Sequence, residues 1–192
     1  MLIKFFSNKK KLNSLLKDLD NSLAIKGENH PDTAEIHIKI GLFYSLKTSF
    51  RVNKEELSIA LEHYHKGLRV YKKMFGDDDL RTAELHCDIA ELYALLYDFP
   101  EALDHYHKGI FVYEREFGDK IEESNVFYVY NEIAKLYEYQ GNLSESLRFF
   151  HKVLPFYIKK YGEENSVVSD INISIKRINE IQKDNRKTVL YS

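Results

Sequence analysis

The 192-residue chain has few of the residues that end helices or cross-link loops: one cysteine, three prolines, eight glycines and no tryptophan. Its single cysteine, Cys87, cannot form a disulfide within the chain and falls far short of a CxxC…CxxC zinc framework. This favours a reducing, intracellular setting. Because so few prolines and glycines leave few places where a helix must stop, the composition predicts an all-α fold.

The chain also lacks a surplus of charge of either sign. It has 28 Lys and Arg residues against 30 Asp and Glu residues, a formal net charge of −2, which disfavours binding to nucleic acid or to an anionic membrane. No apolar run approaches the ~20 residues of a membrane span, and the apolar stretch within Met1–Lys11 is too short for a signal peptide. We therefore expect a cytoplasmic protein with no membrane or nucleic-acid partner.

An internal repeat is the strongest feature of the sequence. The segments Ala60–Gly76 and Ala102–Gly118 both begin Ala-Leu-x-His-Tyr-His-Lys-Gly and end Phe-Gly, and they lie 42 residues apart. A third segment, Ser146–Gly162, has the same length. Periods of about 20 to 50 residues indicate an array of repeated structural units.

A second pattern precedes each copy: an apolar residue, then a small residue, then a tyrosine three positions later. It occurs at Ile40–Tyr44, Ile89–Tyr93 and Ile133–Tyr137. We interpret the two patterns as helices A and B of one unit, which pack closely because small residues let them approach. These small residues are Gly41, Ala90 and Ala134 in helix A, and Gly67 and Gly109 in helix B.

Other residues predict where the helices end or change. Four glycines fall where a helix must stop in a left-handed conformation: Gly27, Gly76, Gly118 and Gly162. The first unit has seven extra residues around Leu46–Glu56, which predicts either about one more turn on each helix or a loop. Pro155 predicts a kinked or shortened helix B in the third unit.

The repeat resembles the tetratricopeptide repeats of kinesin light chain type, whose units are linked by a Gly-x-x-His-Pro-x-Thr-Ala segment. Gly27–Ala34 matches this segment fully, while Gly76–Ala83 lacks the His-Pro. The resemblance covers roughly residues 15–183. It implies an all-α, right-handed α-solenoid of antiparallel helix pairs, a superhelix whose concave face, lined mainly by helix A, binds peptides or protein segments.

From the resemblance we expect a single domain with capped ends. Its parts are a capping half-repeat at 1–26, repeats at 27–75, 76–117 and 118–161, a capping helix at 162–185 and a flexible tail at 186–192. End caps cover a core that the last repeats would otherwise expose.

The register of helix A predicts which residues line the groove. The expected partner-binding residues are Glu35, Ile38, Leu42, Glu84, Cys87, Asp88, Glu91, Leu95, Tyr128, Asn131, Lys135 and Tyr139. This surface is apolar and acidic at its N-terminal end and aromatic and mixed at the other. By charge, we expect a protein or peptide segment that is apolar with Lys or Arg residues, which meet Glu84, Asp88 and Glu91.

Two ligand classes of related proteins do not transfer to this chain. Kinesin light chain repeats carry paired asparagines in helix A that hold a peptide backbone, and only Asn131 occupies such a place here. The chaperone-tail type grips a terminal carboxylate with Lys, Asn and Arg, whereas this surface offers Lys135 and Asn131 among several acids.

Eight histidines invite a metal interpretation, above all the His-x-His pairs at residues 63–65 and 105–107. Residues i and i+2 of a helix point about 200° apart, and equivalent residues of successive repeats lie too far apart to share an ion with bonds of ~2.1 Å. We predict no metal, and a solvated ladder or interhelix packing instead. His37 and His86 fall on a repeat position that usually packs, and local pH sensitivity is left open.

Chemistry of other kinds has no motif here. Cys87 has no base beside it, since His86 points elsewhere on the helix, and we interpret it as a groove-lining or half-buried thiol. No Gly-rich phosphate loop, nucleophile elbow or His-Glu-x-x-His motif occurs. The sequence therefore predicts a scaffold or adaptor that is not an enzyme and holds no cofactor.

Two other functions stay open. A homodimer could form through apolar contacts of Leu2–Phe6 or Val189–Tyr191. The chain could also be a receptor for a small signalling peptide, as some bacterial tetratricopeptide proteins are, although that family normally joins the repeats to an output domain and none is visible in this sequence.

Overall fold

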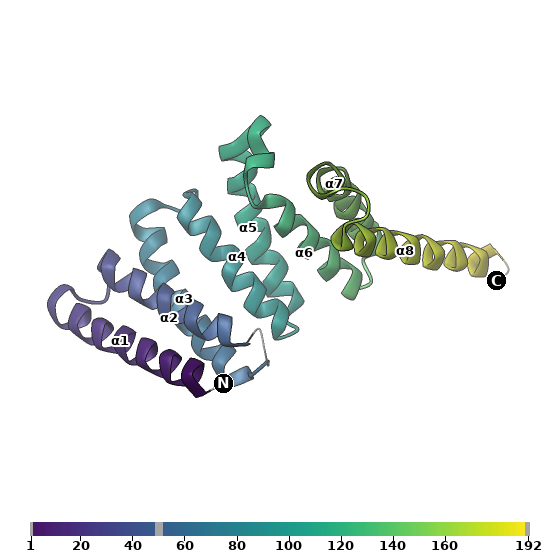
Figure 1. Cartoon of the computed structure of the whole chain (residues 1–192). Coiled ribbons are helices and arrows are strands. Elements are labelled where there is room, and N and C mark those ends of the chain that lie inside the picture. The colour runs from purple at the N-terminus through teal and green to yellow at the C-terminus, as the bar shows by residue number, and fades with distance from the viewer. Residues whose placement is uncertain (1, 49–51, 191–192) are drawn as a thin grey trace. The chain divides into compact units, whose positions relative to one another are not determined.

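The structure is a computed structural model that describes the backbone of residues 2–48 and 52–190, and within these ranges it contains helices and no strand (Figure 1). The helices are α1 (Leu2–Lys26), α2 (Pro31–Thr48), α3 (Lys54–Phe75), α4 (Leu80–Leu95), α5 (Phe99–Phe117), the short 3-10 helix η1 (Gly118–Glu123), α6 (Val126–Tyr139), α7 (Leu143–Tyr161) and α8 (Ser166–Leu190). The all-α prediction is confirmed. None of the described helices has the length and apolar character that crossing a membrane requires.

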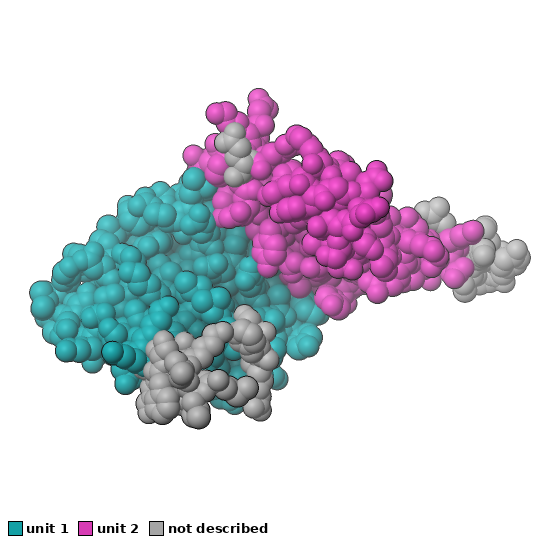
Figure 2. Space-filling model, viewed as in Figure 1, with its two compact units in different colours: residues 1–112 teal, residues 113–192 magenta. Residues whose placement is uncertain are grey.

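The chain divides into two compact units, residues 1–112 and 113–192 (Figure 2). The boundary falls within α5, so unit 1 holds α1 to α4 and most of α5, and unit 2 holds the last residues of α5 with η1 and α6 to α8. The single domain with capped ends that the sequence predicts stays a prediction. The predicted helices A are α2, α4 and α6, and the predicted helices B are α3, α5 and α7.

Each unit is built around large side chains at the predicted repeat positions. In unit 1, Tyr64 of α3 is buried with Ile89 and Leu92 of α4, and Tyr44 and Tyr93 pack against this cluster. In unit 2, the buried core is aromatic and contains Tyr130, Phe149 and Phe150. Aromatic rings bury a large area each, so these few residues supply much of the apolar contact between helices A and B.

The small residues of the repeat let helices A and B come close, as the sequence predicts. A methyl group added at Gly41 would lie 2.6 Å from Cδ1 of Tyr64, and one at Gly67 would lie 2.5 Å from Cγ1 of Ile38. A methyl group at Gly109 would lie 2.4 Å from Sγ of Cys87. Real Cβ atoms do not approach neighbours so closely, so each position requires glycine or a shift of its neighbour.

The linkers that precede helices α2 and α4 are held by the same hydrogen bond. Gly76 has a φ of 91°, the left-handed conformation expected at a helix end, and its carbonyl accepts a hydrogen bond of 2.9 Å from the Thr82 hydroxyl. Gly27 has a φ of 83°, and its carbonyl accepts a hydrogen bond of 2.8 Å from the Thr33 hydroxyl. This contact explains the constant distance between glycine and threonine in the linker motif.

The seven extra residues of the first repeat lie mostly in longer helices. Helix α2 continues four residues beyond Tyr44, where α4 continues two beyond Tyr93, and α3 begins six residues before Ala60, where α5 begins three before Ala102. The two helices thus take up five of the seven extra residues. The rest belong to the connection at 49–53, of which residues 49–51 lie outside the described part.

Two helices run further than the sequence predicts. Helix α7 passes through Pro155 and spans 19 residues, as many as α5, so the predicted shortening is wrong. Proline removes one hydrogen bond, to the carbonyl of residue i−4, and here that residue is the exposed His151. Helix α8 continues to Leu190, beyond the expected end of the capping helix at residue 185.

Candidate partner-binding surface on the A helices

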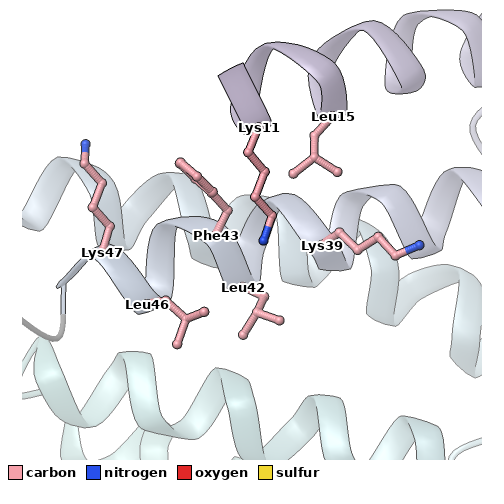
Figure 3. Close-up of a pocket in the computed structure, with 7 residues that line it drawn as sticks. All are labelled: Lys11, Leu15, Lys39, Leu42, Phe43, Leu46 and Lys47. Atoms are coloured by element: carbon pink, nitrogen blue, oxygen red, sulfur yellow. The ribbon is translucent and has the colours of Figure 1, made fainter. Parts of the chain in front are cut away.

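On α2, two of the predicted residues are open to solvent. Leu42 and Leu46 are 45% and 58% exposed and lie one turn apart on the same face of the helix. Together with Leu15 of α1 and Phe43 of α2 they line a pocket of about 450 Å³ (Figure 3). Unit 1 therefore presents an apolar hollow at its first helix A.

The border of this hollow carries charge that is largely balanced. Three lysines line it: Lys11 of α1 and Lys39 and Lys47 of α2 (Figure 3). The predicted residue Glu35 is exposed and lies 2.7 Å from Nζ of Lys39, and Lys47 pairs with Glu56 of α3. Because carboxylates of the same unit hold two of the three lysines, the hollow is chiefly an apolar site.

On α4, the predicted residues form an acidic strip, which we define as Glu84, Asp88 and Glu91. Their spacings of four and three residues put them on one side of the helix. Burial, followed by the charges of Glu91 and Glu84, raises the pKa of Asp88 from 3.8 to about 7. Neither Glu84 nor Asp88 forms an ion pair with any residue that the structure describes. Leu95, 39% exposed, follows one turn later.

Tyr64 of α3 joins the α2 and α4 parts of this surface. Its side chain is 1% exposed, and its hydroxyl forms a hydrogen bond with the side chain of Ser45 on α2. Burial, and then the charges of Asp88 and Glu91, raises the pKa of the phenol. Since α2 and α4 both reach the same buried phenol, the apolar hollow and the acidic strip belong to neighbouring parts of unit 1.

Three predicted groove residues are buried or half-buried, which corrects the expectation that they lie open to solvent. Ile38 is half-buried, Cys87 is 8% exposed and Asn131 is 5% exposed, and all three occupy the same repeat position. In unit 1 the cause is the glycine opposite, Gly67 or Gly109, which lets helix B cover the position.

The thiol of Cys87 is therefore unavailable to a partner in the folded unit. Burial, with smaller contributions from Asp88, Glu91 and Glu84, raises its pKa far above the usual range of a thiol. A buried thiol that does not ionise is a packing group, not a nucleophile.

In unit 2, the predicted residues are only partly brought together. Tyr128, Asn131 and Lys135 of α6 line a pocket of about 210 Å³ with residues of α7 and α8, and Tyr128 is 47% exposed. Tyr139 is 75% exposed and is not among the residues of this pocket. The predicted surface of unit 2 is thus a small pocket with one separate exposed ring.

Two features of this pocket concern its polar groups. Oδ1 of Asn131 is buried and has no hydrogen-bond partner among the described residues, while its Nδ2 lies 3.4 Å from Oε1 of Glu132. Lys135 lies 2.7 Å from Glu132. The pocket is therefore mixed in charge, as the sequence predicts for this end of the surface.

The sequence-based prediction missed the contribution of α8. Asp170, Ile171 and Ser174 of this helix line the pocket of unit 2. A signal was present, because Asp170 follows Gly162 by eight residues, as Glu84 follows Gly76. The capping helix thus has the register of a further helix A.

Four of the histidines lie at contacts between helices A and B. His37 and His86 are each 4% exposed, which confirms the predicted packing role, and each contacts a histidine of the following helix B. Among the described residues, Glu101, Asp104 and His105 bring possible ligand atoms within 4.8 Å of one another. Asp104 already pairs with Lys108 and His105 with His86, so this group gives no reason to assign a metal.

Comparisons with known proteins agree with the helix-pair architecture. A family model described as tetratricopeptide repeat matches residues 127–166. A search of curated protein sequences finds no significant match. Among solved structures, BtubC (BKLC) from P. vanneervenii is similar, with 18% identity and a TM-score of 0.72 over 96% of this chain and 70% of that chain.

A second similar structure is that of nearly identical TPR-like repeats from Podosopora anserina, assigned as a kinesin light chain. It has 11% identity and a TM-score of 0.71 over 96% of this chain and 83% of that chain. A variant of the same repeats with one substitution gives the same TM-score and identity over 82% of that chain. At such identities the likeness concerns the fold. Residues 127–166 thus match a tetratricopeptide repeat, and the chain has the fold of a tetratricopeptide-type α-solenoid, similar to that of these two solved structures.

Proposed function

We propose that this protein is a non-catalytic adaptor that binds a segment of a partner protein on its A helices. Tetratricopeptide repeats generally mediate protein–protein interaction. The observation that carries the proposal is the pairing, within unit 1, of exposed leucines with the acidic strip: Leu42, Leu46 and Leu95 offer apolar contacts, and Asp88 has no cationic partner among the described residues. A cytoplasmic location, which the single cysteine favours, is part of this proposal.

The partner segment that fits this surface is apolar with Lys or Arg residues. The apolar hollow on α2 takes apolar side chains, and the acidic strip on α4 takes a cation. Asp88 is the key group, because burial, and then the charges of Glu91 and Glu84, make its ionised form costly in the free protein. A cation placed beside it removes that cost, so binding and ionisation of Asp88 support each other.

The test is a variant in which the acidic strip is neutralised, Glu84→Gln/Asp88→Asn/Glu91→Gln. Proteins captured from lysate by the wild type are identified, and the dissociation constant of each purified candidate is measured against salt concentration. We expect at least a tenfold weaker binding and a flatter salt dependence for the variant, because one or more charge-assisted contacts are lost. Urea unfolding of the variant, compared with that of the wild type, separates weaker binding from unfolding.

A matched control removes the same charge elsewhere in unit 1. Asp18→Asn/Asp20→Asn/Glu55→Gln changes three exposed acids on α1 and α3. This control should bind like the wild type. Equal affinity and equal salt dependence for the wild type and the acidic-strip variant would refute the proposed surface.

The two alternatives stay predictions. The apolar side chains proposed for a homodimer, at residues 2–6 and 189–191, lie outside the side chains that the structure describes. A mass that rises with concentration, and no longer does so after residues 1–10 are deleted, would identify a dimer if partner binding is unchanged. A small signalling peptide would show itself by binding the wild type without any protein partner.

A further inference from the structure

Two histidine pairs join helix A to helix B in unit 1. Nδ1 of His37 on α2 lies 2.8 Å from Nδ1 of His63 on α3, with ring centroids 5.0 Å apart. Nδ1 of His86 on α4 lies 2.8 Å from Nδ1 of His105 on α5, with ring centroids 4.8 Å apart. The two contacts occupy the same repeat positions, so the arrangement is built twice.

The third helix pair has the same contact without a titratable imidazole. At the positions that correspond to the histidines, unit 2 has Tyr130 on α6 and Phe149 on α7, with ring centroids 5.8 Å apart. Both rings are buried. The Tyr130–Phe149 pair is thus an internal control for the histidine pairs: it packs helix A against helix B and takes up no proton in acid.

The chemistry of an imidazole pair limits how many protons it can hold. A neutral ring has one N–H donor and one acceptor nitrogen, so one proton between the two Nδ1 atoms makes the observed hydrogen bond. A first added proton can bind Nε2 of the donor ring, which leaves the hydrogen bond intact. A second added proton must bind Nδ1 of the acceptor ring, so that both Nδ1 atoms then carry an N–H. Two donors facing each other at 2.8 Å repel, and the helices must separate.

The surroundings of the first pair oppose protonation. Burial is the main cause that lowers the pKa of His37 to about 4, and the charges of His63 and Lys66 add to it, against Glu28 and Glu62. Burial and Lys66 also lower the pKa of His63.

The second pair is placed in a similar setting. Burial is the main cause that lowers the pKa values of His86 and His105 to about 4. The other groups that face this pair are the cations Lys72 and Lys108, the acids Asp77, Glu101 and Asp104, His65, and the ring of Tyr93. The hydroxyl of Tyr93 lies 3.2 Å from Nε2 of His65. Burial also lowers the pKa of His65.

We propose that the two histidine pairs act as a proton-controlled lock, which holds helices A and B of unit 1 together near neutral pH and releases them when the pH falls. The third helix pair has no such lock and stays packed. This regulation is independent of the proposed partner and concerns the shape of the unit that would present the partner surface.

The direction of the effect follows from proton linkage. The folded histidines take up protons at lower pH than the unfolded ones, whose pKa is about 6.5. Their contribution to stability is therefore complete above about pH 6.5 and is lost as the pH falls toward 4. Asp88 acts in the opposite direction, because its pKa is raised in the folded chain, but it is one group against at least three.

The test measures urea unfolding of the full chain from pH 7.5 to 5, with EDTA present so that metal ions contribute nothing. In His37→Tyr/His63→Phe/His86→Tyr/His105→Phe, both pairs become the pair that unit 2 already has. Each buried histidine with a pKa of about 4 accounts for up to about 30-fold in the folding constant over this range. We expect the folding constant of the wild type to fall at least about 100-fold more than that of the variant.

His151→Gln is the matched control, because this exposed histidine of α7 falls at the repeat position of His65 and His107. It should behave like the wild type. Equal pH dependence for the wild type and the four-residue variant would overturn the proposal.

A second measurement decides the matter should the four-residue variant not fold. Ring nitrogen chemical shifts of the wild type should show the paired histidines neutral at pH 6. Amide hydrogen exchange, corrected for its intrinsic pH dependence, should then show that α2 to α4 open more readily at pH 5 than at pH 7, while α6 and α7 do not. Paired histidines that titrate near pH 6.5, or equal opening in both units, would contradict the lock.

Discussion

At the scale of single residues, the distance between helices A and B depends on glycines inside helix B. Gly109 is the clearest case, because a methyl group there would lie 2.4 Å from Sγ of Cys87 and 3.2 Å from the backbone carbonyl oxygen of Ala83. The cysteine can turn aside, but the carbonyl cannot without moving α4. The cost of the added methyl group therefore falls on the packing between α4 and α5.

We expect Gly109→Ala to lower the free energy of unfolding by about 1–3 kcal/mol, because overpacking outweighs the gain in helix propensity of about 1 kcal/mol. Urea unfolding measures the change. The double variant Cys87→Ala/Gly109→Ala, which frees the space of the sulfur, should recover part of the loss relative to Cys87→Ala alone. A single variant as stable as the wild type would show that α4 and α5 adjust freely.

At the scale of elements, the linker before a helix A is held by a side chain that reaches back to the end of the preceding helix. Thr82 is fully buried and donates to the carbonyl oxygen of Gly76 at 2.9 Å, and Thr33 does the same for Gly27. The third link departs from this pattern, since Ser124 donates to the carbonyl oxygen of Ile121 at the end of η1. Ser124 stands six residues after Gly118, where the other two links have a threonine.

Replacing Thr82 by valine keeps the shape of the side chain and leaves the Gly76 carbonyl without this donor. We expect Thr82→Val to lower the free energy of unfolding by about 1–2 kcal/mol. Ser58→Ala, which removes an exposed hydroxyl that bonds the carbonyl of Lys54, should change it by less than about 0.5 kcal/mol. Similar effects of the two substitutions in urea unfolding would argue against a structural role for the linker threonine.

The sequence predicts the elements better than it predicts the surface. Repeated glycines and tyrosines give the helix pairs, because their spacing is a local property of the chain. The exposure of Ile38, Cys87 and Asn131 depends on how closely helix B approaches, which the register of helix A does not contain. The histidine pairs were also out of reach, because partners such as His37 and His63 meet only when α2 and α3 are packed.

At the scale of the whole molecule, stability against pH is set by a few buried groups, not by the net charge of −2. The histidine pairs lower stability in acid, while Asp88 lowers it as the pH rises. The folded pKa of Asp88, about 7, lies above its ordinary value, so its contribution is complete below pH 4 and is lost as the pH rises through 7. Because at least three histidines oppose one carboxyl group, stability rises through the weakly acidic range and reaches its maximum near neutral pH.

Asp88→Asn removes only the loss of stability that ionisation of Asp88 causes as the pH rises. We expect this variant to gain on the order of 2–4 kcal/mol over the wild type at pH 8 and little at pH 4.5, because the wild-type side chain is then protonated. Thermal or urea unfolding at the two pH values gives the comparison. Asp18→Asn on α1, an exposed acid, should give no such pH-dependent gain, and a gain of equal size at both pH values would mean that ionisation of Asp88 is not its cause.

The position filled by a histidine pair twice and by Tyr130 and Phe149 once has a consequence for redesign. The same position between helices A and B accepts a histidine pair or a Tyr–Phe pair, so the two kinds of pair can be exchanged. Versions of the chain with none, one, two or three imidazole pairs differ in how many protons a single opening event consumes. The number of imidazole pairs thus sets how steeply stability falls in acid. This number can be changed in whole steps with residues that the chain already uses.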